Sequence, residues 1–63
     1  MKPSWKDAPE WAQWLAMDED GTWCWFEFEP HVKHGINCLH DGQYKEAETG
    51  RDEPGATYME PRP

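Results

Sequence analysis

The chain has 63 residues and a formal net charge of −7, with 13 acidic residues against 6 Lys and Arg. A chain of this length forms one small domain at most, and a hydrophobic core of that size is only marginally stable alone. The acidic balance argues against direct binding to nucleic acid, which requires cationic side chains, and it favours a basic partner.

Three segments differ in composition. Residues 1–10 carry two prolines and mixed charges, which predicts an N-terminal arm. The apolar residues concentrate in residues 11–44, which we expect to form a small β domain. Residues 45–63 contain three of the six prolines and no Leu, Ile, Val, Phe or Trp. Such a segment buries too little surface to offset its ordering entropy, so we predict a disordered tail.

The start of the β domain admits two interpretations. The Trp-rich alternation before residue 18 favours a strand. The alternative is a helix over residues 7–17, with Asp7 as its cap and Pro9 in its first turn. A helical turn at residues 8–11 that leads into the strand would satisfy both patterns.

The segment 18–21, Asp-Glu-Asp-Gly, predicts a tight hairpin turn. A type I turn followed by a residue in the left-handed region is a standard hairpin connection, and Gly21 accepts that conformation at little cost. The register that follows pairs Asp18 with Thr22, Met17 with Trp23, Ala16 with Cys24, Leu15 with Trp25 and Trp14 with Phe26.

Alternation along this hairpin predicts two different faces. One face is wholly apolar and comprises Ala12, Trp14, Ala16, Cys24, Phe26 and Phe28. The other combines Trp11, Leu15, Met17, Trp23 and Trp25 with Gln13, Glu27 and Glu29. Because both faces carry apolar residues, we expect a homodimer. A stable monomer would instead require the arm, with Trp5, to cover the second face.

A third strand is predicted at residues 36–39, and Asp41-Gly42 offers a further turn with residues 43–45 as a continuation. The fold class that we expect is therefore mostly β. It is a small antiparallel sheet of two to three strands, with a short N-terminal helical turn and a disordered C-terminal tail.

Metal binding and catalysis have little support in the sequence. Donor side chains of the types that zinc prefers are present, and a metal would stabilise so small a fold. However, there is no Cys-x-x-Cys pair, so we expect no metal and no cofactor. The chain is also too short to enclose a nucleophile, a base and an orienting group, which predicts that it is not an enzyme. The side chains considered as zinc ligands are those of Cys24, His31, His34, Cys38 and His40.

The chain offers no membrane or secretion signal that we can identify. No apolar run reaches the length of a bilayer, and no charged segment leads into an apolar one. Two cysteines do not make a disulfide framework, so we expect reduced thiols and a cytoplasmic protein without a membrane partner.

The carboxylates of the hairpin are the main functional lead. Residues i and i+2 of a strand lie about 6.7 Å apart on one face. That repeat is comparable in scale with successive phosphates of a nucleic-acid strand. We therefore predict that a row of carboxylates binds a basic partner in place of a nucleic-acid backbone. The candidate residues are Asp18, Glu19, Asp20, Glu27 and Glu29.

Two alternatives remain open. In the first, Trp11, Trp23 and Trp25 are anchors that grip an apolar groove or a peptide of a partner protein. In the second, the chain is a zinc-stabilised adaptor.

Residues 8–30, APEWAQWLAMDEDGTWCWFEFEP, resemble a motif of small, acidic, Trp-rich, uncharacterised proteins encoded by tailed bacteriophages. The shared features are a Pro-Glu-Trp-Ala opening, an Asp-x-Asp-Gly turn and a Trp-x-Trp-Phe-Glu run. The resemblance implies a phage protein that acts in the host cytoplasm and inhibits a host enzyme with a basic channel for nucleic acid. DNA gyrase is the first candidate.

Overall fold

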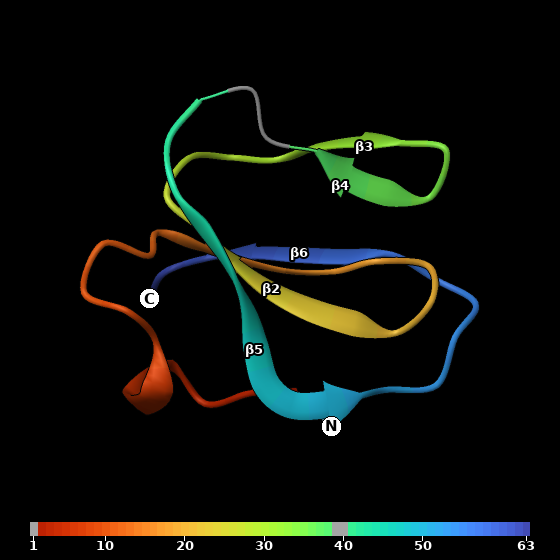
Figure 1. The fold of residues 1–63 in the computed structure, drawn as a ribbon, viewed down its shortest axis with the longest axis horizontal. Coiled ribbons are helices and arrows are strands. Elements are labelled where there is room, and N and C mark those ends of the chain that lie inside the picture. Colours follow the sequence, from red (N-terminus) through yellow and green to blue (C-terminus); the bar gives the residue numbers. More distant parts are fainter. Residues whose placement is uncertain (1, 39–40) are drawn as a thin grey trace.

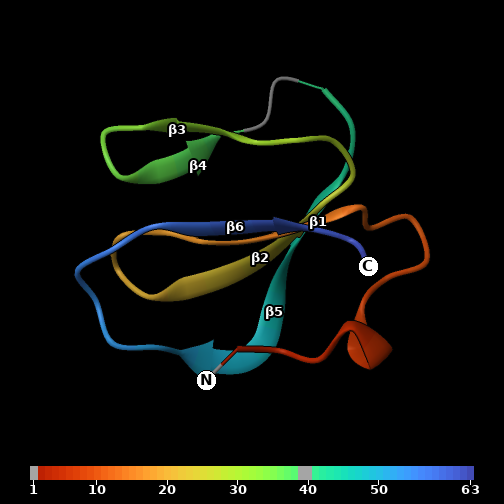
Figure 2. The ribbon, with the colours of Figure 1, turned by 180° about the vertical axis from the view of Figure 1, so that it is seen from behind.

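The structure is a computed structural model that describes residues 2–38 and 41–63. Four strands form one antiparallel sheet in the order β5-β2-β1-β6, and two further strands form a separate β3-β4 hairpin (Figure 1). The hairpin lies on one side of the sheet and the N-terminal arm on the other, as Figure 2 shows from behind. The elements are η1 (Trp5–Asp7), β1 (Trp14–Met17), β2 (Thr22–Phe26), β3 (His31–Lys33), β4 (Ile36–Cys38), β5 (Tyr44–Arg51) and β6 (Tyr58–Pro61).

The central β1-β2 hairpin confirms the predicted register from Trp14 opposite Phe26 to Met17 opposite Trp23. Its turn closes through a 2.9 Å hydrogen bond that the Gly21 amide donates to the Asp18 carbonyl. Gly21 has a φ of 90°, the left-handed conformation that the turn requires. The register prediction therefore holds over the paired strands, because turn chemistry and side-chain alternation act on neighbouring residues. The expected faces also included residues 11–13 and 27–29, which lie outside β1 and β2.

The N-terminal region also follows the strand interpretation. A 3-10 turn covers Trp5–Asp7, with Ser4 as its cap, and β1 begins at Trp14. The short helical turn is thus present, but it lies at residues 5–7 rather than 8–11. A helix over residues 7–17 does not form, because the Trp-rich alternation matches a strand that is paired on both edges.

The prediction of a disordered tail is wrong. Residues 45–63 contribute most of β5 and all of β6, which are the two outer strands of the sheet. β5 pairs with β2, and β6 pairs with β1. Few apolar side chains suffice there, because an outer strand gains backbone hydrogen bonds from its neighbour while its polar side chains stay in water. The sheet consequently has four strands rather than two to three.

The predicted third strand has a different partner. β4, Ile36–Cys38, falls inside the expected range, but it pairs with β3 and not with the sheet. Leu39, the last residue of that prediction, lies outside the described residues. The expected continuation at residues 43–45 is the beginning of β5, which extends to Arg51.

The main buried cluster lies on the sheet face that carries Leu15, Trp23 and Trp25, and it also includes Ala12 and Ala47. Ala12, which alternation placed on the apolar face, precedes β1 and packs with this cluster instead. Ala16 and Phe26 of the apolar face are buried as well. The arm covers the face of the main cluster, since the Trp5 ring packs 4.9 Å from the Trp25 ring, centroid to centroid. This is the arrangement that we expected of a stable monomer. The homodimer stays a prediction.

The C-terminal end of the chain is hydrogen-bonded to the segment that precedes β1. Arg62 donates through its backbone amide to the Gln13 carbonyl at 2.7 Å and through Nη1 to the Ala12 carbonyl at 2.6 Å. Its guanidinium lies 5.6 Å from the centroid of the Trp5 ring. The C-terminal end therefore holds both the arm and the approach to β1.

Glu60 connects the arm to β6. Its carboxylate accepts hydrogen bonds of 2.7 Å from Trp5 Nε1 and 2.7 Å from the Tyr58 hydroxyl, and it pairs with Lys2. Burial disfavours the charged carboxylate, but the hydrogen bonds from Lys2, Trp5 and Tyr58 outweigh it. They lower the pKa of Glu60 from 4.5 to about 2.

A group with a depressed folded pKa stabilises the fold above its unfolded pKa and loses that effect as the pH falls through the folded pKa. We therefore expect Glu60→Gln to cost about 1 to 3 kcal/mol of unfolding free energy at neutral pH. The deficit should shrink between pH 4.5 and pH 2. Urea unfolding followed by tryptophan fluorescence measures both. The exposed Glu48→Gln variant is the control, and an equal loss in the control would refute the role of Glu60.

Candidate functional site

Three loops meet at one end of the molecule, where the acidic β1-β2 turn lies between the β3-β4 turn and the β5-β6 loop (Figure 1). The Glu19 amide donates to the Gly35 carbonyl at 2.8 Å, and the Gly55 amide donates to the Glu19 carbonyl at 2.9 Å. The Asp52 amide donates to the Gly21 carbonyl at 2.8 Å. The backbone of the acidic turn is thus fixed from both sides.

This end of the sheet concentrates carboxylates from two distant segments of the chain. We call it the acidic end, and it comprises Asp18, Glu19, Asp20, Asp52 and Glu53. A hollow of about 420 Å³ lies among these loops, and its lining includes His34 and Pro54 beside the three turn carboxylates. The site is shallow and charged, which suits a flat partner surface better than a small substrate.

The carboxylates of the acidic end have two different roles. Asp18 Oδ1 accepts hydrogen bonds of 2.8 Å from both the backbone amide and Nδ2 of Asn37. Asp52 Oδ2 accepts from Trp23 Nε1 at 3.4 Å. Glu19 and Glu53 are exposed. Asp18 and Asp52 therefore support the fold, whereas the two glutamates present their charge to solvent.

Asp20 combines the two roles. It is exposed, and its Oδ1 accepts a 2.9 Å hydrogen bond from the Thr22 amide. That hydrogen bond lowers the pKa of Asp20 below its ordinary value, so its carboxylate stays charged further into the acidic range.

The predicted row of five carboxylates does not form. Glu27 and Glu29 follow the opposite end of β2, about 16 Å from the turn at the rise of a strand. Glu27 holds the start of β5, because its Oε1 accepts from the Gln43 amide at 3.0 Å. Glu29 is exposed in the loop before β3. The residues that lie near the turn carboxylates are instead Asp52 and Glu53. Both belong to residues 45–63, the segment that we expected to be disordered.

The three candidate tryptophans lie in or against the core. Trp23 and Trp25 are only 4% and 3% exposed, and Trp11 is half-buried and packs against the same cluster. An anchor of the kind proposed in the first alternative presents its ring to a partner. The Trp25 ring instead packs on Trp5 of the arm, and the Trp23 ring packs edge-on against Tyr58 of β6.

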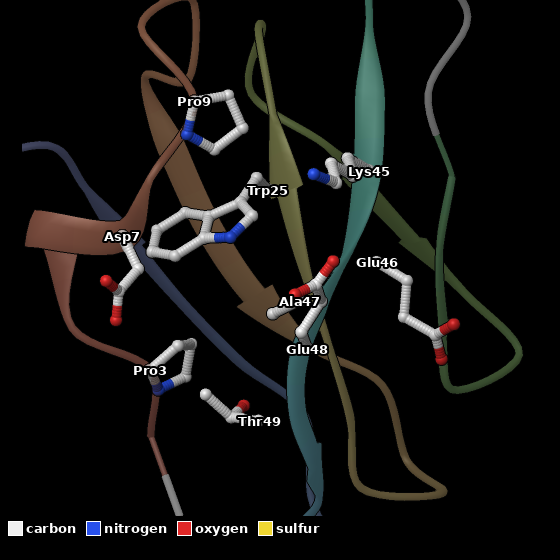
Figure 3. A pocket seen from close by; sticks show the side chains of 9 residues that line it. All are labelled: Pro3, Asp7, Pro9, Trp25, Lys45, Glu46, Ala47, Glu48 and Thr49. Atoms are coloured by element: carbon white, nitrogen blue, oxygen red, sulfur yellow. The ribbon is translucent and has the colours of Figure 1, made fainter.

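A groove of about 370 Å³ runs between the arm and β5 on the core side of the sheet (Figure 3). Trp25 and Ala47 lie at its centre, Pro3, Asp7 and Pro9 on one side, and Lys45, Glu48 and Thr49 on the other. Glu46 borders the groove, but its side chain points away from it (Figure 3). The carboxylates of the groove exceed its single ammonium group, so this surface also favours a basic partner over an acidic one.

The zinc ligands considered from the sequence are not brought together. Within residues 2–38 and 41–63, no three His, Cys, Asp or Glu side chains are arranged to hold a metal ion. His40 lies outside the described residues. Burial raises the pKa of Cys24 to about 11, and the charges of Asp18, Glu46 and Asp20 act in the same direction. A thiol that is protonated at neutral pH is a poor nucleophile and a poor metal ligand.

No protein-family model matches the chain, and comparisons with curated proteins and with solved structures found no match. In the part of the chain that the structure describes, no helix has the length and hydropathy needed to cross a bilayer.

Proposed function

We propose that this chain is a non-enzymatic acidic protein that binds the basic, nucleic-acid-binding surface of a partner protein and thereby excludes the nucleic acid. The observation that carries the proposal is the hydrogen-bonded cluster of three loops at the acidic end. Carboxylates from residues 18–20 and 52–53 are held there on a fixed backbone. Charges that are fixed before binding lose little conformational entropy on association.

The resemblance of residues 8–30 to phage proteins supports a host enzyme as the partner, and DNA gyrase is the first candidate. Binding would then take place in the host cytoplasm. The partner contributes Lys and Arg side chains that otherwise contact phosphates, so complementary charge should act mainly on the association rate.

The test compares two double variants, in each of which two glutamates are replaced by uncharged glutamines. Glu19→Gln with Glu53→Gln removes two exposed carboxylates from the acidic end, and Glu29→Gln with Glu48→Gln removes two exposed carboxylates elsewhere. Asp18 and Asp20 stay in place because their hydrogen bonds hold the turn. Surface plasmon resonance on immobilised gyrase, at low and high salt, measures association and dissociation separately.

We expect the acidic-end pair to slow association several-fold at low salt and the control pair to slow it less. The difference should shrink at high salt, because exposed charges are screened beyond about 8 Å at physiological ionic strength and over shorter distances at higher salt. A DNA duplex should compete with the protein for gyrase. Equal effects of the two pairs, or a ternary complex with DNA, would contradict the proposal.

A further inference from the structure

A crevice of about 400 Å³ lies between the β3-β4 hairpin and the sheet face that carries Cys24 and Phe26. It is distinct from the hollow at the acidic end and from the groove beside the arm. Phe26 and Tyr44 form an aromatic wall, with ring centroids 6.1 Å apart and ring planes inclined by 23°. Phe26 is 3% exposed, whereas Tyr44 is 68% exposed. The Tyr44 ring therefore lies at the mouth of the crevice with much of its surface available to a ligand.

The polar part of the crevice contains an acceptor without a donor. Asn37, which lines the crevice, is 8% exposed, and its Nδ2 donates to the Met17 carbonyl at 3.1 Å and to Asp18 Oδ1 at 2.8 Å. Both of these partners are acceptors, so the orientation of the Asn37 amide is fixed. Its Oδ1 is buried and has no hydrogen-bond partner among the residues that the structure describes. A buried acceptor without a donor is unfavourable, and its position indicates where a donor would be accommodated.

Carboxylates lie in and around the crevice, and Asp18 is part of its lining. Cys24 lies beside Phe26 in the lining and opposite Glu46 in the β2-β5 register. Its pKa is raised to about 11 by burial and further by Asp18, Glu46 and Asp20. The same carboxylates that disfavour a thiolate favour a cation.

We propose that this crevice binds the side chain of an arginine that the basic partner supplies, an inference that rests on the proposed function. A guanidinium is planar and stacks on an aromatic face such as that of Tyr44. Its fork of N–H donors suits the Asp18 carboxylate in the lining, and a donor that reaches the buried Asn37 Oδ1 would supply the hydrogen bond that this atom lacks. A lysine offers a compact charge without the planar surface, so arginine fits this lining better.

The test is a ¹⁵N NMR titration with acetyl-Gly-Arg-Gly-amide. The same peptide with citrulline is the control, because citrulline keeps the planar shape and lacks the charge. We expect the arginine peptide to shift the Asn37 side-chain amide and the Cys24 and Tyr44 backbone amides, and the citrulline peptide to shift them much less. Tyr44→Ala should weaken binding by about three- to tenfold. Phe28→Ala, which removes an exposed ring outside the crevice lining, should leave it unchanged.

A matched pair of charge variants completes the test. Glu46→Gln should weaken arginine binding, whereas Glu48→Gln, on the same strand, should not. Shifts confined to the acidic end, or binding that Tyr44→Ala leaves unchanged, would overturn the arginine site and leave the proposed function standing. An absence of shifts at both the crevice and the acidic end would count against both.

Discussion

Replacing Gly21 by alanine should leave most of the chain unfolded at room temperature. A Cβ at this position would lie 2.0 Å from the Asp52 carbonyl oxygen and 2.8 Å from its carbon. These are backbone atoms of the neighbouring loop, so they cannot move aside without breaking the Asp52 to Gly21 hydrogen bond. The φ of 90° adds a conformational cost of about 1 to 2 kcal/mol for an L-residue.

We expect a total loss of more than about 3 kcal/mol, which approaches the whole stability of a domain of this size. Circular dichroism and urea unfolding measure it. Gly50→Ala is a matched control, because Gly50 has a φ of 81° and an added Cβ would meet no atom within 4 Å. It should lose only the conformational part, about 1 to 2 kcal/mol. Equal losses in the two variants would refute the close approach of Asp52.

Trp5→Ala should be the most damaging change within the N-terminal arm. The substitution removes the ring that packs on Trp25, the 2.7 Å hydrogen bond to Glu60 and the surface that lies under Arg62. We expect a loss of about 2 to 4 kcal/mol, because Trp5 is half-buried and truncation of a fully buried tryptophan costs somewhat more. The Trp25 ring should become exposed, which shifts tryptophan fluorescence to longer wavelength.

Trp5→Phe separates packing from hydrogen bonding, since it keeps a ring on Trp25 and loses the donor to Glu60. It should cost about 1 kcal/mol. Analytical ultracentrifugation of Trp5→Ala also tests self-association, because an uncovered core face is a site for a second copy. An unchanged fluorescence spectrum and full stability would show that the arm does not protect the core.

Much of the central hairpin could be predicted from the sequence, since its determinants are local. Gly21 and the acidic turn set the connection, and the alternation from Trp14 to Met17 sets the register. The face that is buried could not be predicted in this way. Alternation left open which face is buried. The arm and β5 bring Trp5 and Ala47 to the face of Leu15, Trp23 and Trp25, while Ala16 and Phe26 are buried on the other face.

The residues of the candidate site likewise fall into a group that the sequence predicted and a group that it did not. Asp18, Glu19 and Asp20 are adjacent in the sequence and were found from it. Asp52 and Glu53 were missed, although the following Pro54-Gly55 dipeptide is a turn signal. Their place at the acidic end depends on the path of β5 back along β2.

The sequence by itself therefore determined the elements whose contacts lie within a few residues: the acidic turn, the paired strands around it and the excess of negative charge. Only the tertiary structure decided that the C-terminal third is ordered, that Trp23 and Trp25 are interior and that a crevice lies under the β3-β4 hairpin. The physical reason is the range of the interactions. Turn conformation and alternation are properties of neighbouring residues, whereas the Asp18 to Asn37 and Trp5 to Glu60 hydrogen bonds join segments that meet only after folding.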